Sequence, residues 1–217
     1  MKKEYAFLLI AFVVISSCDK DPIISNDKNV GISEVIYYPK ITLTGNSIIT
    51  FENGTPFTDP GAHAIAGGVD VPVITSGTVD NMTDGVYRIT YTATSDEGFS
   101  ATATRTVVIY TTAPDAAAHD LSGIYLRAAT GETATWTKIA PGVYTVQNPG
   151  GSPAGPDLVV IAINPSGYTI SIPEQIASDG SESSSSNESY DNSDPATYSW
   201  IFLNPGYGTG VRTFVKQ

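Results

Sequence analysis

Residues 86–94 read VYRITYTAT, and their side chains alternate between two faces of an extended chain. Tyr87, Ile89, Tyr91 and Ala93 would point to one side of a strand, and mostly polar side chains would point to the other. Such alternation is typical of an antiparallel strand with one buried face and one solvent face. The stretch therefore predicts an all-β fold for the part of the chain around it.

Shorter runs of the same kind surround this strand, and turn residues separate them. The runs cover residues 41–44, 48–51, 69–74 and 101–110. Between them stand sequences such as Glu52-Asn53-Gly54 and Asp96-Glu97-Gly98, whose Asn, Asp and Gly residues favour tight turns. Short strands at this regular spacing predict an antiparallel β-sandwich over residues 39–113.

A second set of candidate strands follows in residues 121–217. They cover 123–128, 133–139, 143–147, 158–163, 168–172, 198–203 and 210–215. Turns containing Pro and Gly separate several of them, and such a meander closes most naturally into a small barrel or sandwich. Residues 114–120 predict a linker between the two domains. No segment after Ser17 shows the 3.6-residue apolar period of a helix.

A low-complexity segment interrupts the second domain. Residues 178–194 read SDGSESSSSNESYDNSD, with five carboxylates, no basic residue and little to bury. That composition predicts a mobile surface loop. Carboxylates are also ligands for calcium, so calcium binding is the alternative, but their spacing fits no EF-hand. We therefore expect no metal site.

The first 17 residues predict a signal peptide. Lys2 and Lys3 precede an apolar run over residues 5–15, which is well short of the roughly 20 residues of a spanning helix. Two serines then precede Cys18, the only cysteine, in an order that resembles a bacterial lipobox. The resemblance implies cleavage before Cys18 and lipid attachment to it, whereas a plain secretory signal is the alternative. Residues 18–38 predict a flexible tether.

The charge of the chain excludes one class of partner. The formal net charge is −11, and removal of residues 1–17 leaves 9 basic and 21 acidic side chains, or −12. Such a chain repels phosphate backbones, so we expect no nucleic acid partner. It also repels anionic lipid, so the predicted membrane attachment depends on the acyl chains of Cys18.

The sequence contains no recognisable catalytic motif. It has no Gly-x-Ser-x-Gly elbow, no P-loop and no pair of histidines at metal-binding spacing. The two histidines, His63 and His119, stand far apart, and a lone histidine is usually structural. Two carboxylates can form a glycosidase pair, but nothing in the sequence selects one pair. We therefore predict that the protein is not an enzyme and holds no cofactor.

The candidate ligand-binding residues are aromatic. Both tryptophans, Trp136 and Trp200, lie in the second domain, and Tyr198 shares a strand face with Trp200. Sugars bind proteins by laying their C–H faces on aromatic rings, while polar groups take the hydroxyls. The alternative is that these residues are core, because residues 198–203 are apolar on both faces.

Several motifs resemble a known family. ITLTG (41–45), FTDPGA (57–62), GVYRITY (85–91) and RTVVI (105–109) resemble the bacterial Ig-like domains of unknown function that are common in Bacteroidetes lipoproteins and cell-wall proteins. The resemblance implies an Ig-like sandwich that acts as a rigid spacer or recognition module. It implies no catalytic residues.

The second domain carries a related resemblance. DLSGIY (120–125), TKIAPGVY (137–144) and IPEQ (172–175) resemble the C-terminal domain that often follows this Ig-like module. Such two-domain lipoproteins often accompany polysaccharide uptake systems. The resemblance therefore implies a lipid-anchored, outward-facing outer-membrane protein that binds polysaccharide as an accessory of an uptake complex. A periplasmic location of the anchored protein is the alternative to the outward-facing one. The alternative is a structural adaptor that contacts another outer-membrane protein and binds no sugar.

Overall fold

The computed structural model describes residues 29–30 and 33–217. The predicted signal peptide at 1–17, the predicted lipidation site Cys18 and most of the predicted tether at 18–38 lie outside these described residues. One compact unit spans Tyr37–Gln217 and contains both predicted β domains. The two short strands β1 (Asn29–Val30) and β2 (Ser33–Glu34) pair with each other in a separate unit.

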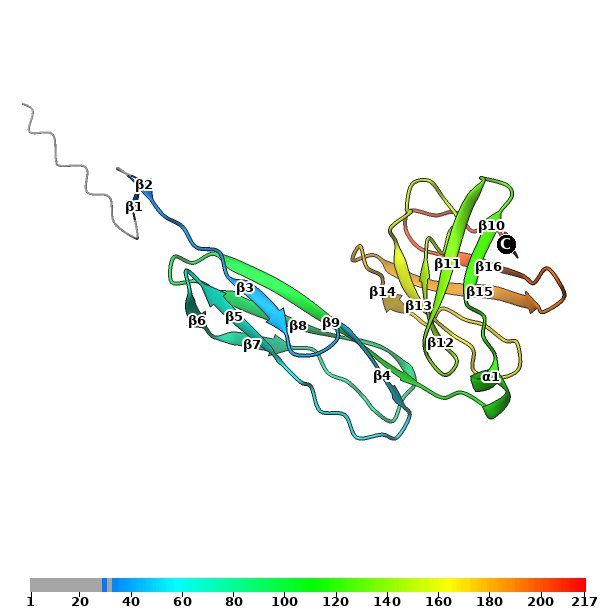
Figure 1. Cartoon of the computed structure of the whole chain (residues 1–217), viewed down its shortest axis with the longest axis horizontal. Helices are drawn as coiled ribbons and strands as arrows, with labels where there is room; N and C mark the ends of the chain where they lie inside the picture. The colour runs from blue at the N-terminus through cyan, green and yellow to red at the C-terminus, as the bar shows by residue number, and fades with distance from the viewer. Residues whose placement is uncertain (1–28, 31–32) are drawn as a thin grey trace, which may run out of the picture. The chain divides into compact units, whose positions relative to one another are not determined.

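Two sheets form the N-terminal domain (Figure 1). The first has the order β3-β5-β6, with β3 at Lys40–Leu43, β5 at Ala62–Ala66 and β6 at Val69–Val71. The second has the order β4-β9-β8-β7, with β4 at Ile48–Glu52, β9 at Ser100–Tyr110, β8 at Gly85–Thr94 and β7 at Val73–Ser76. Strand β4 runs parallel to β9, whereas β8 runs antiparallel to both β9 and β7. The predicted sandwich is confirmed.

One predicted strand of this domain proves to be two. Residues 69–74 were expected as a single strand, but Pro72 separates β6 from β7, and the chain crosses there from one sheet to the other. Proline has no amide hydrogen to donate to a ladder, so it marks the position where pairing can change.

The core of the N-terminal domain encloses a charged side chain. Ile89, Tyr91, Val107 and Ile109 are buried between the sheets, and Arg105 lies among them without solvent exposure. Its Nη2 donates to the carbonyl oxygens of two loop residues, at 2.8 and 2.9 Å. Its Nε lies 3.5 Å from a carboxylate oxygen of Asp59, and the same oxygen accepts a hydrogen bond of 2.6 Å from the Tyr91 hydroxyl. Asp59, expected as a turn residue, therefore also balances a buried charge.

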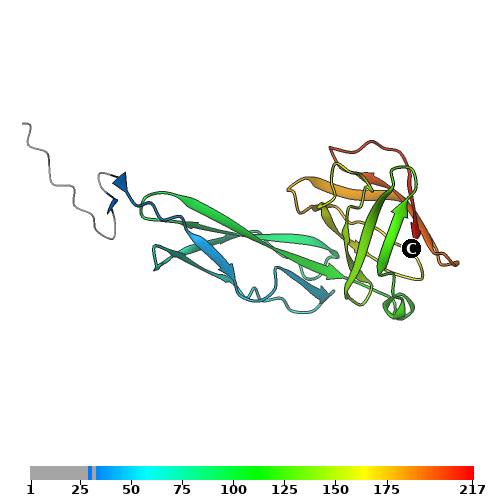
Figure 2. The same ribbon diagram turned by 45° about the horizontal axis from the view of Figure 1, so that its top comes forward.

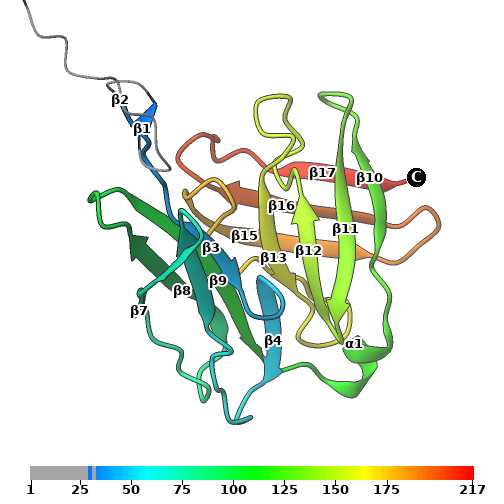
Figure 3. The ribbon, with the colours of Figure 1, turned by 60° about the vertical axis from the view of Figure 1, so that its left-hand side comes forward.

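The C-terminal domain is an eight-stranded antiparallel sheet that curls into a nearly closed barrel (Figure 3). The strand order is β13-β12-β11-β10-β17-β16-β15-β14. The strands are β10 (Gly123–Arg127), β11 (Glu132–Ala140), β12 (Val143–Gln147), β13 (Val159–Ile163), β14 (Gln175–Ile176), β15 (Glu182–Asp191), β16 (Thr197–Leu203) and β17 (Arg212–Lys216). The predicted all-β fold with a small second barrel is confirmed.

Side chains and a few isolated backbone hydrogen bonds close the seam of this barrel beyond the regular strand pairing. The Gln175 side chain accepts a hydrogen bond from the Ile161 amide at 2.7 Å and donates to the Ile161 carbonyl at 2.8 Å. It thus takes the place of a neighbouring strand for Ile161 on β13. Further along the seam, Ser178 exchanges hydrogen bonds with the backbone of Val159, and Ser171 bridges to Ile163. The predicted strand at 168–172 is reduced to this single bridge.

The predicted mobile loop at 178–194 is instead mostly the ten-residue strand β15. It pairs along β16, with Ser185 opposite Phe202 and Tyr190 opposite Tyr198. Small serine side chains fit beside the bulky aromatic residues of β16 and find polar partners, as Ser183 does with Asn204 at 3.0 Å. Pairing to an aromatic strand therefore overrides a composition that is typical of disorder.

The predicted linker at 114–120 contains a short helix. Helix α1 (Pro114–Ala118) begins with proline at a first-turn position and joins the end of β9 to the start of β10 (Figure 2). The two domains also share a small apolar cluster, in which Val108 and Tyr110 of β9 pack with Val143, Ile161 and Ile163 of the barrel. Within the ranges described above, no helix has the length and apolar character needed to cross a bilayer.

Candidate functional site

The three aromatic residues predicted to bind a ligand lie inside the barrel. Trp136 is 2% exposed, Trp200 is 0% exposed and Tyr198 is 1% exposed. The two tryptophan rings stack with centroids 5.5 Å apart, and Tyr198 packs edge-on against both. A ring without solvent exposure cannot lie against a sugar. The predicted binding role of these residues is therefore corrected to a core role.

The polar atoms of these three buried side chains differ in their hydrogen bonding. Trp200 Nε1 donates to the carbonyl oxygen of Pro149 at 2.9 Å and so fixes the glycine-rich segment that begins there. In the described part of the chain, Trp136 Nε1 and the Tyr198 hydroxyl are buried without a hydrogen-bond partner. Burial raises the pKa of Tyr198, because a phenolate would lose its hydration there.

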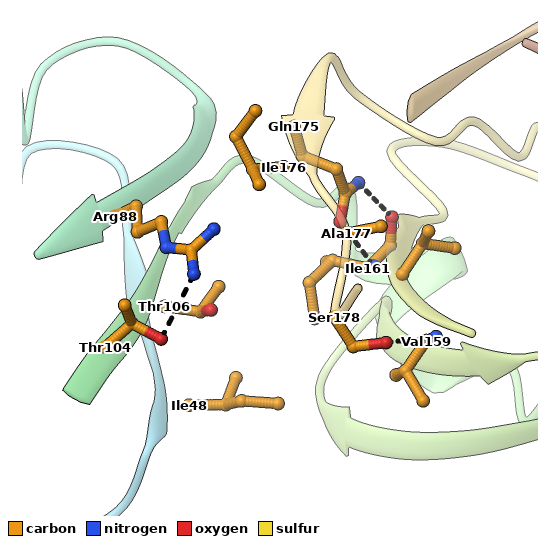
Figure 4. A pocket seen from close by; sticks show the side chains of 11 residues that line it. Ile48, Arg88, Thr104, Thr106, Val159, Ile161, Gln175, Ile176, Ala177 and Ser178 are labelled. Atoms are coloured by element: carbon orange, nitrogen blue, oxygen red, sulfur yellow. Dashed lines mark hydrogen bonds between the residues drawn. The ribbon is translucent and has the colours of Figure 1, made fainter. Parts of the chain in front are cut away.

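A narrow cleft lies where the two domains meet (Figure 4). Arg88, Thr104 and Ile48 line one side of it, and residues 175–178 of the barrel seam line the other. Its volume is about 100 Å³, which is below the roughly 300–1,000 Å³ of typical ligand pockets. The side chains of its barrel wall, Gln175 and Ser178, are engaged in closing the seam. This cleft therefore belongs to the domain junction.

A row of three nearly parallel rings lies elsewhere on the C-terminal domain. We call His119, Tyr168 and Tyr190 the ring row. The rings of His119 and Tyr168 stack 4.0 Å apart at 5°, and those of Tyr168 and Tyr190 stack 5.7 Å apart at 7°. All three side chains are half-buried. The row thus presents aromatic surface at a place that solvent reaches.

Each member of the ring row is held in place by a hydrogen bond. His119 Nδ1 donates to the carbonyl oxygen of Gly167 at 2.9 Å. The Tyr168 hydroxyl accepts from Asn192 Nδ2 at 2.7 Å, and the Tyr190 hydroxyl bonds to the Tyr125 hydroxyl at 3.1 Å. Burial raises the pKa of Tyr190, so its hydroxyl stays neutral at ordinary pH. The row is consequently a preorganised surface.

An open hollow of about 480 Å³ lies beside the ring row, between residues 168–170 and residues 188–190. Strand β15 contains a β-bulge here, because Ser186 pairs with Ile201 and Ser189 pairs with Ser199, which leaves one extra residue on β15. Asn187 within the bulge has a positive φ of 53°. Bulges re-aim side chains, and this one places Glu188 at the wall of the hollow.

The polar groups of the hollow suit hydrogen bonding to a ligand. Glu188 Oε1 accepts a hydrogen bond of 2.5 Å from the Ser185 hydroxyl, which itself accepts from the Ile172 amide at 2.7 Å. No described residue donates a hydrogen bond to the other oxygen, Oε2. Thr169 and Ser189 add hydroxyl groups to the wall. Aromatic surface and hydrogen-bonding groups therefore meet in one place.

The sequence did not predict this site. Tyr168 lies in a segment expected to be a strand, and Glu188 and Tyr190 lie in the segment expected to be a mobile loop. The one available signal was Tyr190, the only aromatic residue within 178–194. An aromatic residue in a polar tract indicates that part of the tract packs against something.

The two histidines and the acidic side chains form no metal centre in the part of the chain that the structure describes. His63 Nε2 lies 3.0 Å from an Asp70 carboxylate oxygen on the surface of the N-terminal domain, and His119 belongs to the ring row. Asp179 and Asp191 cap their own turns, where hydrogen bonds from Ser181 and Ser193 lower their pKa values. Turn stabilisation accounts for these carboxylates.

Comparison with known proteins supports the N-terminal assignment. Residues 41–109 match the family model described as "Bacterial surface protein, Ig-like domain", which confirms the resemblance found in the sequence. The chain is also similar to the lipoprotein BT2262 from Bacteroides thetaiotaomicron, whose crystal structure aligns with 26% identity and a TM-score of 0.41 over 83% of this chain and 100% of that one. No curated protein sequence matches the chain.

Proposed function

We propose that this protein is a non-catalytic lipoprotein of the outer membrane, in which the Ig-like domain holds the C-terminal barrel outward and the barrel binds polysaccharide for an uptake complex. The observation that carries the proposal is the ring row beside an open hollow of about 480 Å³. Aromatic faces next to hydroxyl and carboxylate groups are the combination that sugars require, because they present both C–H faces and hydroxyls.

The domain order supports the spacer part of this proposal. A match to a surface Ig-like domain precedes the barrel in the chain, so the barrel is the domain further from Cys18 in sequence. The apolar cluster around Val108 and Ile161 joins the two domains. Attachment at Cys18 would then leave the barrel as the part presented to the surroundings.

The adaptor hypothesis is the second candidate, and a specific observation favours it. Both tryptophans are buried, so the most effective sugar-stacking side chains of the chain are not available to a ligand. In addition, Val69 and Ile74 of the N-terminal domain expose more than half of their side-chain surface. Exposed apolar residues of this kind are common at protein contact sites, although single ones are also ordinary.

Affinity electrophoresis tests the carbohydrate proposal. The soluble form that begins after Cys18 is run through native gels that contain different polysaccharides, beside a protein that binds no sugar. We expect at least one polysaccharide to slow the protein relative to the reference. Unchanged mobility in every gel would remove the carbohydrate proposal and leave the adaptor.

A separate experiment tests the anchor. Cells expressing the full chain are labelled with radioactive palmitate, and the Cys18→Ser variant is labelled alongside. We expect label and membrane association in the natural protein, and neither label nor lipid-dependent association in the variant, because the thiol that accepts the lipid is gone. Equal labelling of both proteins would refute the lipobox interpretation.

A further inference from the structure

We propose that the hollow beside the ring row binds an uncharged polysaccharide, with Tyr190 as the stacking surface and Glu188 as the acceptor for sugar hydroxyls. This inference rests on the proposed carbohydrate function and names its site and ligand class. The residues of this site are reached by solvent, whereas the tryptophans that the sequence suggested as binding residues are buried.

The position of Tyr190 in the ring row fits it for stacking. Tyr168 stacks on two rings, those of His119 and Tyr190. Among the described residues, Tyr190 stacks on one ring, that of Tyr168. Its hydroxyl is anchored on Tyr125, which is fully buried, so the ring is ordered before a ligand arrives. A preordered ring loses little conformational entropy on binding.

Glu188 supplies the polar half of the site. The Ser185 hydroxyl donates a hydrogen bond to Glu188 Oε1, which fixes the direction of the carboxylate. Oε2 accepts no hydrogen bond from the described residues, so it can accept one from a ligand. Hydrogen bonds from hydroxyls to a carboxylate are charge-assisted and stronger than neutral ones. Glu188 and Tyr190 both line the hollow from β15. A sugar that stacks on Tyr190 can therefore also donate a hydroxyl hydrogen bond to Glu188.

The charge around the hollow selects the ligand class. Glu188 is the one charged residue among the six that line the hollow. Two more carboxylates are near Tyr190: Asp191 is the next residue in the chain, and Asp120 is close enough in space to add to burial in raising the pKa of Tyr190. Two cations lie near Asp120. The Nζ of Lys138 is occupied by the carbonyl oxygens of Ala117 and His119 at 3.1 and 2.6 Å, and the Nζ of Lys216 lies over the Tyr125 ring, 5.7 Å from its centroid. A uronic acid or sulfated sugar would meet repulsion here, whereas a neutral sugar would not.

The test uses affinity electrophoresis of the soluble two-domain protein in gels with galactomannan, xyloglucan, mixed-linkage glucan or polygalacturonate. Tyr190→Leu removes the ring, and Glu188→Gln removes the charge while the side-chain size is kept. Tyr38→Leu is the matched control, because Tyr38 is 65% exposed, contacts Phe99 of the N-terminal domain and lies outside the hollow. Tryptophan emission and circular dichroism check that each variant is folded. If Tyr190→Leu is not folded, Tyr168→Leu takes its place, because it removes the ring on which Tyr190 stacks.

We expect a neutral polysaccharide to slow the natural protein and the Tyr38→Leu variant alike. Tyr190→Leu should weaken that binding at least tenfold, and Glu188→Gln should weaken it several-fold. Retardation of the natural protein with unchanged binding by both hollow variants would overturn this site and leave the proposed function standing. Retardation by polygalacturonate alone would overturn the ligand class. Retardation by none of the four would overturn both the site and, for these glycans, the function that it rests on.

Discussion

Replacing Gln175 by leucine should destabilise the barrel at its seam. The side chain is 6% exposed and makes three hydrogen bonds, two to Ile161 and one of 3.0 Å to the carbonyl oxygen of Pro173. Leucine has a similar volume, so it leaves the Ile161 amide and carbonyl buried without partners. Each such orphaned group costs about 1–3 kcal/mol. We therefore expect the free energy of unfolding to fall by about 2–6 kcal/mol for the two groups together.

Urea denaturation followed by tryptophan emission measures this change directly. Both tryptophans lie in the barrel, so their emission reports the unfolding of that domain. Gln147→Leu is the matched control, because the Gln147 side chain is exposed and makes one hydrogen bond, to the carbonyl oxygen of Pro156 at 3.0 Å. The free energy of unfolding of this control variant should fall by less than about 1 kcal/mol. Equal losses for the two variants would refute the argument that Gln175 closes the seam.

Three further predictions concern other parts of the fold. Asn187→Ala should lower stability by about 1 kcal/mol and Asn187→Gly should be nearly neutral, since φ is 53° there; equal melting temperatures would contradict this. Burial raises the pKa of Tyr125 and Tyr198 above the ordinary value, so their contribution to stability is complete below about pH 10 and is lost as the pH rises further. Phenolate absorbance should therefore appear together with the change in tryptophan emission, and ionisation of these tyrosines without unfolding would contradict it. Val108→Ala removes two buried methyl groups and should cost about 1.5 kcal/mol. Although Val108 lies in the N-terminal domain, the loss of stability should lower the urea midpoint that the emission of the barrel tryptophans reports. An unchanged midpoint would show that the two domains unfold independently.

The all-β architecture could be predicted from the sequence because period-two alternation is a local signal. Residues 86–94 alternate over nine positions and form most of β8. The same alternation locates β12 and β16 within a residue of their observed bounds. Turn residues supplied the divisions between strands. Local sequence thus contained most of the information on which segments are extended.

Pairing partners are the part that the sequence did not supply. Strand β15 has a composition typical of disorder, and it is ordered by the aromatic strand β16 beside it. This pairing depends on the strand that follows β15 in the chain, and no property of residues 182–191 alone reveals it. For the same reason the side-chain closure by Gln175 had no local signature.

Prediction of the candidate site requires knowing which face of each strand points into the barrel. Alternation shows that Tyr198 and Trp200 share a face, but it does not show which face turns inward when a sheet curls into a barrel. The structure turns that face to the interior, so the predicted binding residues become core. The ring row gathers residues from α1's exit, a loop and β15, and only the folded chain brings them together.

The parallel pairing of β4 and β9 has a mechanical consequence. Strand β4 lies near the start of the N-terminal domain, and β9 leads out of it toward the barrel. A chain pulled at its two ends draws these parallel strands in opposite directions along their length. The five paired positions from Ile48 to Glu52 then carry the load together in shear, instead of opening one after another like a zip. The Ig-like domain is thus built to resist a force that pulls its two chain ends apart.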